Sequence, residues 1–354
     1  MAPMARTPEP PIDATAVFPG LAAFARTTFR LHPRPGDPGT GDSSVGGPLL
    51  WPAGEPWPVC TGTHSGEREV QVSSPATPFT SVEDMRAFAK EFSQEYARDH
   101  GPQERLSFHL DGTVTAHVHE GREPGSPYPL IAVLQLHARD VPDLPFPEET
   151  DVLQVLWCPN EHEMPVVGPK PYAFWRRAAD VASVLADPPL PVFEDDHGAR
   201  DYYPAPCVLH PERVTEYPHP DDLPEDLRER IEEWDEEQAG QDENEDPFPG
   251  PYETDLSTAP GTKALGWPSW IQVPQRPDCV GCGQPMTHLA TISSEESENW
   301  ENGAGTRWQA ADLPDRFFRN HAPHGLMIGD MGSMYLFTCT RCPDRPLGSS
   351  VQFG

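Results

Sequence analysis

The sequence predicts an α+β fold that is rich in β-strands, with two pseudo-symmetric subdomains, short strands, long Pro/Gly loops and few helices. Of 354 residues, 46 are proline and 28 are glycine. These residues suit turns and strand ends but interrupt long helices. Two halves of the chain repeat the order loop, cysteine, strand, strand, cysteine. Two Cys-x-x-Cys pairs in the C-terminal half predict zinc knuckles there.

Two helices are expected before the most acidic part of the chain. The first covers 81–99, where Ser81 is the expected N-cap and apolar residues recur at helical spacing. The second covers 173–185, where apolar residues again recur every three to four positions. The proline pair at 188–189 is expected to end it.

Strands are expected before the second of these helices. A hairpin is predicted at 105–119, with Leu110 opposite Val114. Apolar runs predict buried strands at 128–136 and 151–158. The hairpin's polar face would carry three histidines, for which we favour a solvated surface over a metal site. These are His109, His117 and His119.

The chain is strongly acidic, with a formal net charge of −31 at pH 7. Charge of this sign argues against nucleic acid, whose phosphates must be neutralised, and against anionic membrane surfaces. Nearly half of the charge lies in an acidic insertion at 221–255, where a helix is expected over 224–238 and a polar loop after it. The insertion is interpreted either as a lure for a basic partner or as a solvated surface segment.

Four cysteines in the last quarter of the chain give the strongest chemical signal. They form two Cys-x-x-Cys pairs, whose thiolates converge as tetrahedral zinc requires. The pairs are Cys279 with Cys282, and Cys339 with Cys342. Four sulfur ligands close the coordination shell, so the predicted Zn²⁺ is structural. A redox dithiol and four unrelated core cysteines are the alternatives.

An internal duplication relates the two halves of the chain. The Trp- and Pro-rich segment 46–60 resembles 265–279, and each segment ends in a cysteine. Each is followed by two similar apolar strands and a further cysteine. In the first half, Cys60 and Cys158 hold the cysteine positions. This indicates either a degenerate copy that has lost its metal or two small core residues.

These segments resemble the YwqG-like family of bacterial domains and, more distantly, the eukaryotic programmed cell death protein 2 group. The similar pieces are 46–52, 134–136, 152–156, 216–218, 265–272, the cysteine pairs and 329–337. The resemblance implies an α+β, β-rich fold with internal pseudosymmetry. It also implies a role as a chaperone of a basic ribosomal protein or as an immunity protein against a toxin. It supplies no catalytic residues, and 61–127 and 224–262 are interpreted as insertions outside it.

The expected organisation follows from these segments. It consists of a disordered leader at 1–12, an N-terminal subdomain at 13–190 with a helical and hairpin insertion at 61–127, a connecting segment at 191–262 with the acidic insertion 221–255, and a C-terminal zinc-knuckle subdomain at 263–354. The sequence contains no membrane helix and no signal-peptide core. Seven cysteines, four of them expected to bind metal, indicate a reducing, cytoplasmic compartment.

The predicted function is that of a non-catalytic, zinc-stabilised cytoplasmic protein that binds a basic protein or peptide. Four tryptophans in the Pro-rich loops are candidates for an aromatic groove that takes an extended peptide. They are Trp51, Trp57, Trp267 and Trp270. The alternative is a hydrolase or other enzyme with a site near His321 and His324 or in the cluster Asp195–Asp201, since the recognisable catalytic motifs are missing. The sequence does not specify the oligomeric state.

Overall fold

A computed structural model provides the structure of the chain. It describes residues 7–73, 78–100, 105–109, 111–122, 127–160, 162, 168–191, 199–238, 251–296, 306–308 and 322–353. The chain divides into two compact units: unit 1 comprises 1–60, 128–159 and 166–354, and unit 2 comprises 61–127 and 160–165. Strands predominate over helices in the described ranges, which confirms the predicted β-rich fold class.

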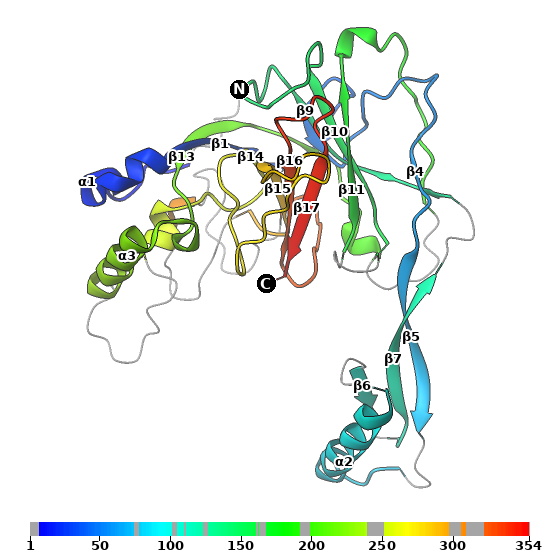
Figure 1. The fold of residues 1–354 in the computed structure, drawn as a ribbon. Coiled ribbons are helices and arrows are strands. Elements are labelled where there is room, and N and C mark those ends of the chain that lie inside the picture. The colour runs from blue at the N-terminus through cyan, green and yellow to red at the C-terminus, as the bar shows by residue number, and fades with distance from the viewer. Residues whose placement is uncertain are drawn as a thin grey trace. The chain divides into compact units, whose positions relative to one another are not determined.

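Unit 1 contains two six-stranded sheets, in which all paired strands are antiparallel (Figure 1). The first sheet has the order β13 (Glu212–Glu216), β1 (Arg26–Arg30), β14 (Lys263–Leu265), β15 (Thr287–Ser293), β16 (Ser333–Thr338) and β17 (Leu347–Gln352). The second has the order β11 (Lys170–Arg176), β10 (Val152–Cys158), β9 (Ile131–His137), β3 (Ser44–Val45), β12 (Cys207–Val208) and β2 (Arg34–Pro35).

The two sheets repeat one topology. In chain order, β1, β2, β3, β9, β10 and β11 correspond to β12, β13, β14, β15, β16 and β17. The ladders β9–β10 and β15–β16 pair in the same register, and each is interrupted by a one-residue bulge, at Val133 and at Leu289. β1 and β12 each lie in the sheet built mainly by the other half of the chain. The duplication inferred from the sequence is therefore a duplication of structure, and its halves exchange strands.

The two repeats also share a backbone conformation at the ends of β3 and β14, the third strand of each repeat. Gly46 and Leu265 hold equivalent positions, and both have φ of 64°. At Gly46 a Cβ would lie 2.6 Å from the carbonyl oxygen of Pro204, so a side chain is sterically excluded there.

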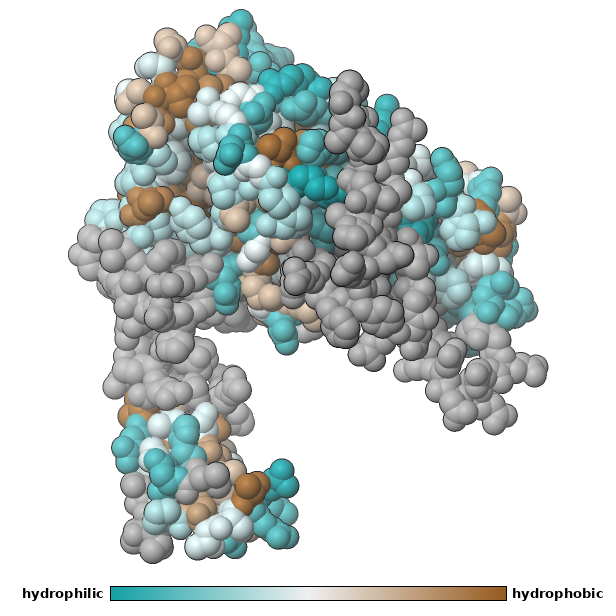
Figure 2. Space-filling view, turned by 180° about the vertical axis from the view of Figure 1, so that it is seen from behind, coloured by the Kyte–Doolittle hydropathy of each residue, from teal (hydrophilic) through white to brown (hydrophobic). Residues whose placement is uncertain are grey.

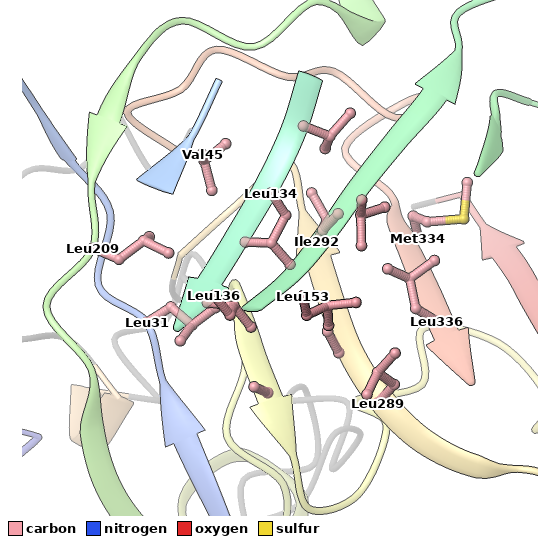
Figure 3. Close-up of a cluster of buried hydrophobic side chains, with 14 of the residues drawn as sticks. Leu31, Val45, Leu134, Leu136, Leu153, Leu209, Leu289, Ile292, Met334 and Leu336 are labelled. Atoms are coloured by element: carbon pink, nitrogen blue, oxygen red, sulfur yellow. The ribbon is translucent and has the colours of Figure 1, made fainter. Parts of the chain in front are cut away.

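The main core lies where the two sheets face each other. Apolar side chains from β9 and β10 meet those from β15 and β16 (Figure 3). The side chains labelled there are Leu31, Val45, Leu134, Leu136, Leu153, Leu209, Leu289, Ile292, Met334 and Leu336. β10 and β16 are buried along their whole length, as their largely apolar sequences predict. Each fully buried side chain of this size contributes about 1.5–3 kcal/mol of transfer free energy.

A second core attaches helix α3 (Glu225–Gln238) to the start of the chain. Its apolar side chains Leu227 and Ile231 are buried among residues from α1 (Ala14–Val17) and η1 (Pro19–Phe24). Phe18 packs edge-on against Trp234 with ring centroids 5.6 Å apart. The helix expected at 224–238 is thus present, with its apolar stripe facing inward.

The first residues of the chain are connected to the same region. Residues 1–6 of the expected leader lie outside the described ranges. Thr7 donates from its backbone N–H and its hydroxyl to Glu212 Oε2, at 2.8 and 2.7 Å. Asp13 caps α1 by accepting a hydrogen bond from the backbone N–H of Thr15 at 2.9 Å.

Unit 2 consists of a three-stranded sheet and one long helix. The sheet has the order β5 (His64–Ser73), β7 (Val114–Arg122) and β6 (Arg105–Phe108), and the helix is α2 (Val82–His100). The helix predicted at 81–99 is confirmed. Aromatic rings of α2 contact one another and Phe108 of the sheet. None of the helices described in the chain combines the length and the apolar character that a membrane span requires.

The predicted register of the hairpin in unit 2 is wrong by two residues. Phe108, and not Leu110, lies opposite Val114. The Asp111 carboxylate accepts a hydrogen bond from the backbone N–H of Thr113 at 2.9 Å and so tightens the turn. A shift of two residues leaves each side chain on its expected face. The side chains of His117 and His119 lie outside the described ones.

The helix predicted at 173–185 is also wrong. Residues up to Arg176 form β11, which pairs with β10 along its length. Ala173 and Trp175 contact the core between the sheets, whereas Tyr172 and Phe174 contact a cluster on the opposite face. A strand with apolar residues on both faces can also show apolar residues three or four positions apart. The spacing in this segment therefore did not distinguish a helix from a strand.

A buried ion pair joins the first sheet to its loops. Lys263 Nζ lies 3.0 Å from Glu216 Oε2, and both side chains are 0 % exposed. The same carboxylate accepts hydrogen bonds from the backbone N–H groups of Ala259 and Trp267. Gly266 has φ of +72°, and a Cβ there would lie 2.1 Å from Glu216 Oε1. Two strands and two loops therefore meet at one carboxylate.

Removing the cation of this pair is expected to destabilise unit 1 strongly. Lys263→Met leaves the Glu216 carboxylate charged and buried without its partner, which costs about 3–5 kcal/mol. Urea unfolding of the full chain measures this loss. The matched control is Arg213→Met, which breaks the exposed pair with Asp143 and should cost less than about 1 kcal/mol. Equal losses in the two variants would contradict the assigned role of the buried pair.

Glu296 is a second buried carboxyl group in unit 1. It is 8 % exposed and accepts a hydrogen bond from the backbone N–H of Thr262 at 3.1 Å. Burial raises the pKa of Glu296 to about 7. The pKa in the unfolded chain, about 4.5, is lower, so folding favours the protonated form.

This shift predicts that stability falls as the pH rises. The contribution of Glu296 to the free energy of unfolding is complete below about pH 4.5 and is lost as the pH passes about 7. A pKa shift of this size corresponds to about 3 kcal/mol. Glu296→Gln should therefore stabilise the protein at pH 8 and change little at pH 4.5. Thermal unfolding between these values tests this, with the exposed Glu229→Gln as control. An effect of Glu296→Gln that is independent of pH would contradict it.

Candidate metal centre

The first cysteine pair lies at the tip of a tight hairpin in unit 1. The backbone N–H of Cys279 donates to the carbonyl of Gln284 at 2.8 Å, and that of Gly283 donates back to the carbonyl of Cys279 at 2.7 Å. Gly283 has φ of 65°, the left-handed conformation that glycine adopts at no steric cost. The hairpin therefore brings Cys282 back beside Cys279, as the Cys-x-x-Cys spacing predicts.

The second pair follows directly after β16. The backbone N–H of Cys339 donates to the carbonyl of Pro346 at 3.2 Å. The Cys342 carbonyl accepts from the backbone N–H of Arg345 at 3.1 Å and from its guanidinium at 3.2 Å. One knuckle thus lies in a loop hairpin and the other at a strand end.

The four sulfurs converge at distances that suit a metal ion. Cys279 Sγ lies 3.8 Å from Cys342 Sγ, Cys282 Sγ lies 3.5 Å from Cys339 Sγ, and all four atoms lie within 4.8 Å of one another. A tetrahedral zinc ion with Zn–S bonds of about 2.3 Å places its sulfurs about 3.8 Å apart. All four cysteines are free thiols. These residues therefore form a group that can hold a metal ion.

Backbone N–H groups and neighbouring thiols shift the pKa values of these cysteines in opposite directions. The backbone N–H of Cys342 points at the sulfur of Cys339 and lowers the pKa of Cys339 to about 6. The adjacent Cys282 and Cys339 raise the pKa of Cys342 to about 12. Thiols held this close cannot all ionise without a compensating cation, so metal binding and proton release are coupled.

An apolar layer supports the centre from inside the protein. Cys279 and Cys339 are buried in a cluster with Trp270, Tyr335 and Phe337. The Trp270 ring lies 4.8 Å from the Tyr335 ring, centroid to centroid. These aromatic side chains pack beneath the sulfurs, and a set of four thiolates is the ligand set typical of structural zinc sites.

The four candidate tryptophans point mainly into the protein. Trp51, Trp267 and Trp270 are 1 %, 7 % and 6 % exposed, and Trp57 is half-buried. Trp51 and Trp57 contact each other with centroids 5.1 Å apart. All four indole N–H groups donate within the protein, to Glu55 O, Leu130 O, Phe24 O and Asp222 Oδ2. These side chains stabilise the two Pro-rich loops.

His324 is a core residue. It is 0 % exposed, and burial lowers its pKa to about 3, so the imidazole is neutral. Its Nδ1 accepts a hydrogen bond from the backbone N–H of Leu326 at 3.2 Å. His321 and most of the Asp195–Asp201 cluster lie outside the described residues. Asp201 is exposed in η3 (Ala199–Tyr202).

Sequence reasoning missed two residues that belong to a second ligating group. Cys60, His64, Cys158 and His162 present four ligand atoms within 4.8 Å of one another, so they too can hold a metal ion. The signal was present as a Cys-x-x-x-His spacing that occurs at both cysteines.

Comparison with family models and with curated proteins finds no match to this chain.

Loss of one ligand should empty the Cys₄ centre. Cys282→Ser and Cys339→Ser are each expected to lose one bound zinc ion and to lower the melting temperature of unit 1, because metal-binding free energy is folding free energy in such sites. Elemental analysis and thermal unfolding with and without a chelator measure both effects.

Cys207→Ser provides the matched control. Cys207 is a buried free cysteine whose pKa burial raises to about 11, and it belongs to neither ligating group. This variant should keep its full metal content. Native, chelator-insensitive stability in Cys282→Ser or Cys339→Ser would refute a structural metal at this centre.

Proposed function

We propose that this protein is a non-catalytic, zinc-stabilised binding protein that captures a basic protein or peptide. The Cys₄ geometry supports a structural metal, since four thiolates complete the shell. Zinc suits this set because soft thiolates in a tetrahedral arrangement favour it over calcium or magnesium. The buried, neutral His324 offers no group for catalysis at the surface.

The observation that carries the proposal is the charge on α3. Seven acidic side chains of this helix are exposed, against one exposed arginine. The acidic residues are Glu225, Asp226, Glu229, Glu232, Glu233, Glu236 and Glu237. The apolar stripe of α3 is buried in unit 1, which holds the charges in one place. A fixed acidic face steers and selects a basic partner.

One acidic residue of α3 faces inward and marks the limit of that surface. The Asp235 carboxylate accepts a hydrogen bond from the backbone N–H of Tyr252 at 2.8 Å. Burial raises the pKa of Asp235 to about 6. It therefore belongs to the attachment of the helix. Residues 239–250 of the acidic insertion lie outside the described residues.

The surface also fits electrostatic recognition more than apolar docking. On the face shown in Figure 2, hydrophobic residues appear in small groups among hydrophilic ones. Apolar contacts between proteins usually need a larger continuous patch. The −31 net charge has the sign that attracts a basic polypeptide.

The resemblance to the YwqG-like family and the programmed cell death protein 2 group supports the same class of function. In those terms, the protein is a chaperone of a basic protein or an immunity protein against a basic toxin. Seven free thiols fit a reducing, cytoplasmic compartment. A toxin gene beside this one would favour the immunity role.

Capture with matched baits tests the proposal. The full chain, the triple variant Glu229→Gln, Glu233→Gln and Glu236→Gln, and a control with the same charge change on α2 are used to capture proteins from the cell's own lysate at low salt. The control carries Glu83→Gln, Glu91→Gln and Glu95→Gln, all at exposed positions.

A basic protein recovered by the wild type and by the α2 control, at least tenfold depleted with the α3 variant and released by moderate salt, is the expected result. The purified partner should then bind the wild type with a salt-dependent Kd. Equal depletion with both variants would assign the capture to net charge alone. Equal recovery by all three baits would remove α3 as the binding surface.

A further inference from the structure

The structural repeat identifies the counterpart of the Cys₄ centre in the first half of the chain. β4 (Val59–Cys60) pairs with β8 (Tyr128–Pro129), and Val59 pairs with Pro129 as Asp278 pairs with Pro285. The flanking hydrogen bonds match as well. Leu130 N–H donates to Pro58 O at 3.0 Å, and Met286 N–H donates to Pro277 O at 3.0 Å. Cys60 therefore holds the position of Cys279.

Cys158 holds the position of Cys339 by the same argument. It follows Trp157 at the end of β10, and Trp157 pairs with Ile131 as Thr338 pairs with Thr287. Cys60 and Cys158 are 1 % and 0 % exposed and lie in one buried cluster. The hydroxyl of Tyr172 donates to Cys60 Sγ at 3.7 Å. Two of the four ligand positions of the Cys₄ centre are thus retained as cysteine.

Histidines supply the two remaining ligands. His64 follows Cys60 by four positions and His162 follows Cys158 by four, where the second repeat has a cysteine three positions on. His64 and His162 form an antiparallel bridge, and their rings meet edge to face with centroids 4.9 Å apart. The two Sγ atoms and one nitrogen of each imidazole lie within 4.8 Å of one another.

Hydrogen bonds hold both imidazoles, and the one at His162 is of the kind found in metal sites. His162 Nδ1 lies 3.2 Å from the carbonyl oxygen of Thr63, which can only accept, so Nδ1 carries the proton and Nε2 carries the lone pair. His64 Nδ1 lies 3.3 Å from Asn160 Nδ2, an amide nitrogen that donates, so Nδ1 of His64 is the acceptor in this contact. A backbone carbonyl on the second nitrogen, as at His162, is a usual support for a ligating histidine.

We propose that Cys60, His64, Cys158 and His162 form a second structural zinc site, the counterpart of the Cys₄ centre in the first repeat. Two thiolates and two imidazoles complete a tetrahedral shell, and this donor set selects zinc over the hard cations calcium and magnesium. The sequence left open whether this half had lost its metal or merely held two small core cysteines; in the proposed site it has exchanged two of its ligands. The proposal is independent of partner binding.

The insertion accounts for the exchange of one of the two ligands. In the second repeat the chain runs from Cys279 to Pro285 through the short hairpin tip, whereas in the first repeat residues 61–127 intervene between Cys60 and Tyr128. Such an insertion removes the tip that carries the second cysteine. His64, the fourth residue of the inserted segment, supplies the missing ligand.

X-ray absorption of the wild-type full chain, purified in the presence of zinc, tests the proposal without any variant. Elemental analysis should give two zinc ions per chain. The spectrum should show a mean coordination shell of three sulfurs and one nitrogen per zinc, the average of the two sites. One zinc per chain with a shell of four sulfurs would overturn the proposal, because only the Cys₄ centre would then be filled.

Variants assign the ions to their sites. His64→Ala with His162→Ala should lose one zinc ion and leave a shell of four sulfurs. Cys339→Ser should keep one zinc ion with two sulfurs and two nitrogens. The control His109→Ala changes an exposed histidine outside both ligating groups and should keep both zinc ions. Two zinc ions in the double histidine variant would refute the site, whereas failure of that variant to fold leaves the wild-type spectrum as the deciding measurement.

Discussion

The Glu216 carboxylate is the contact on which the first sheet depends. Fully buried, it is compensated by Lys263 and by two backbone N–H groups from separate loops. One of these loops continues through Trp270, which lies under the Cys₄ centre. Because an uncompensated buried charge is so unfavourable, the strand, the loops and the carboxylate must reach their positions together. The loop that packs beneath the four cysteines is therefore anchored at this carboxylate.

Strand exchange gives the duplication its structural meaning. β1 pairs in the sheet of the second half and β12 in that of the first, so neither half completes a six-stranded sheet alone. The same register and the same bulge recur in both sheets, which places the end of β10 where the end of β16 lies. Cys158 and Cys339, which directly follow Trp157 and Thr338 at these ends, therefore hold equivalent places in the repeated topology. The two ligating groups occupy equivalent places in it.

Apolar packing and acidic surface charge are separate in unit 1. The interface between the sheets forms the framework of unit 1 and is built from buried apolar side chains. The acidic face of α3 is attached to that framework by its apolar stripe. Charge at the surface affects association without entering the core, since exposed acidic residues contribute little to stability. This division explains how a very acidic chain still builds a well-packed interior.

The sequence by itself determined the features that arise within a few residues. The Cys-x-x-Cys spacing located all four ligands of one centre, and helical periodicity located α2 and α3, because knuckles and amphipathic helices are local structures. Tertiary structure decided the rest. Phe174 lies in a strand because β10 offers a ladder, the tryptophans turn inward because the sheets bury them, and His64 meets His162 only when distant strands assemble. Which face is buried and which segments meet are set by long-range packing, which local spacing does not encode.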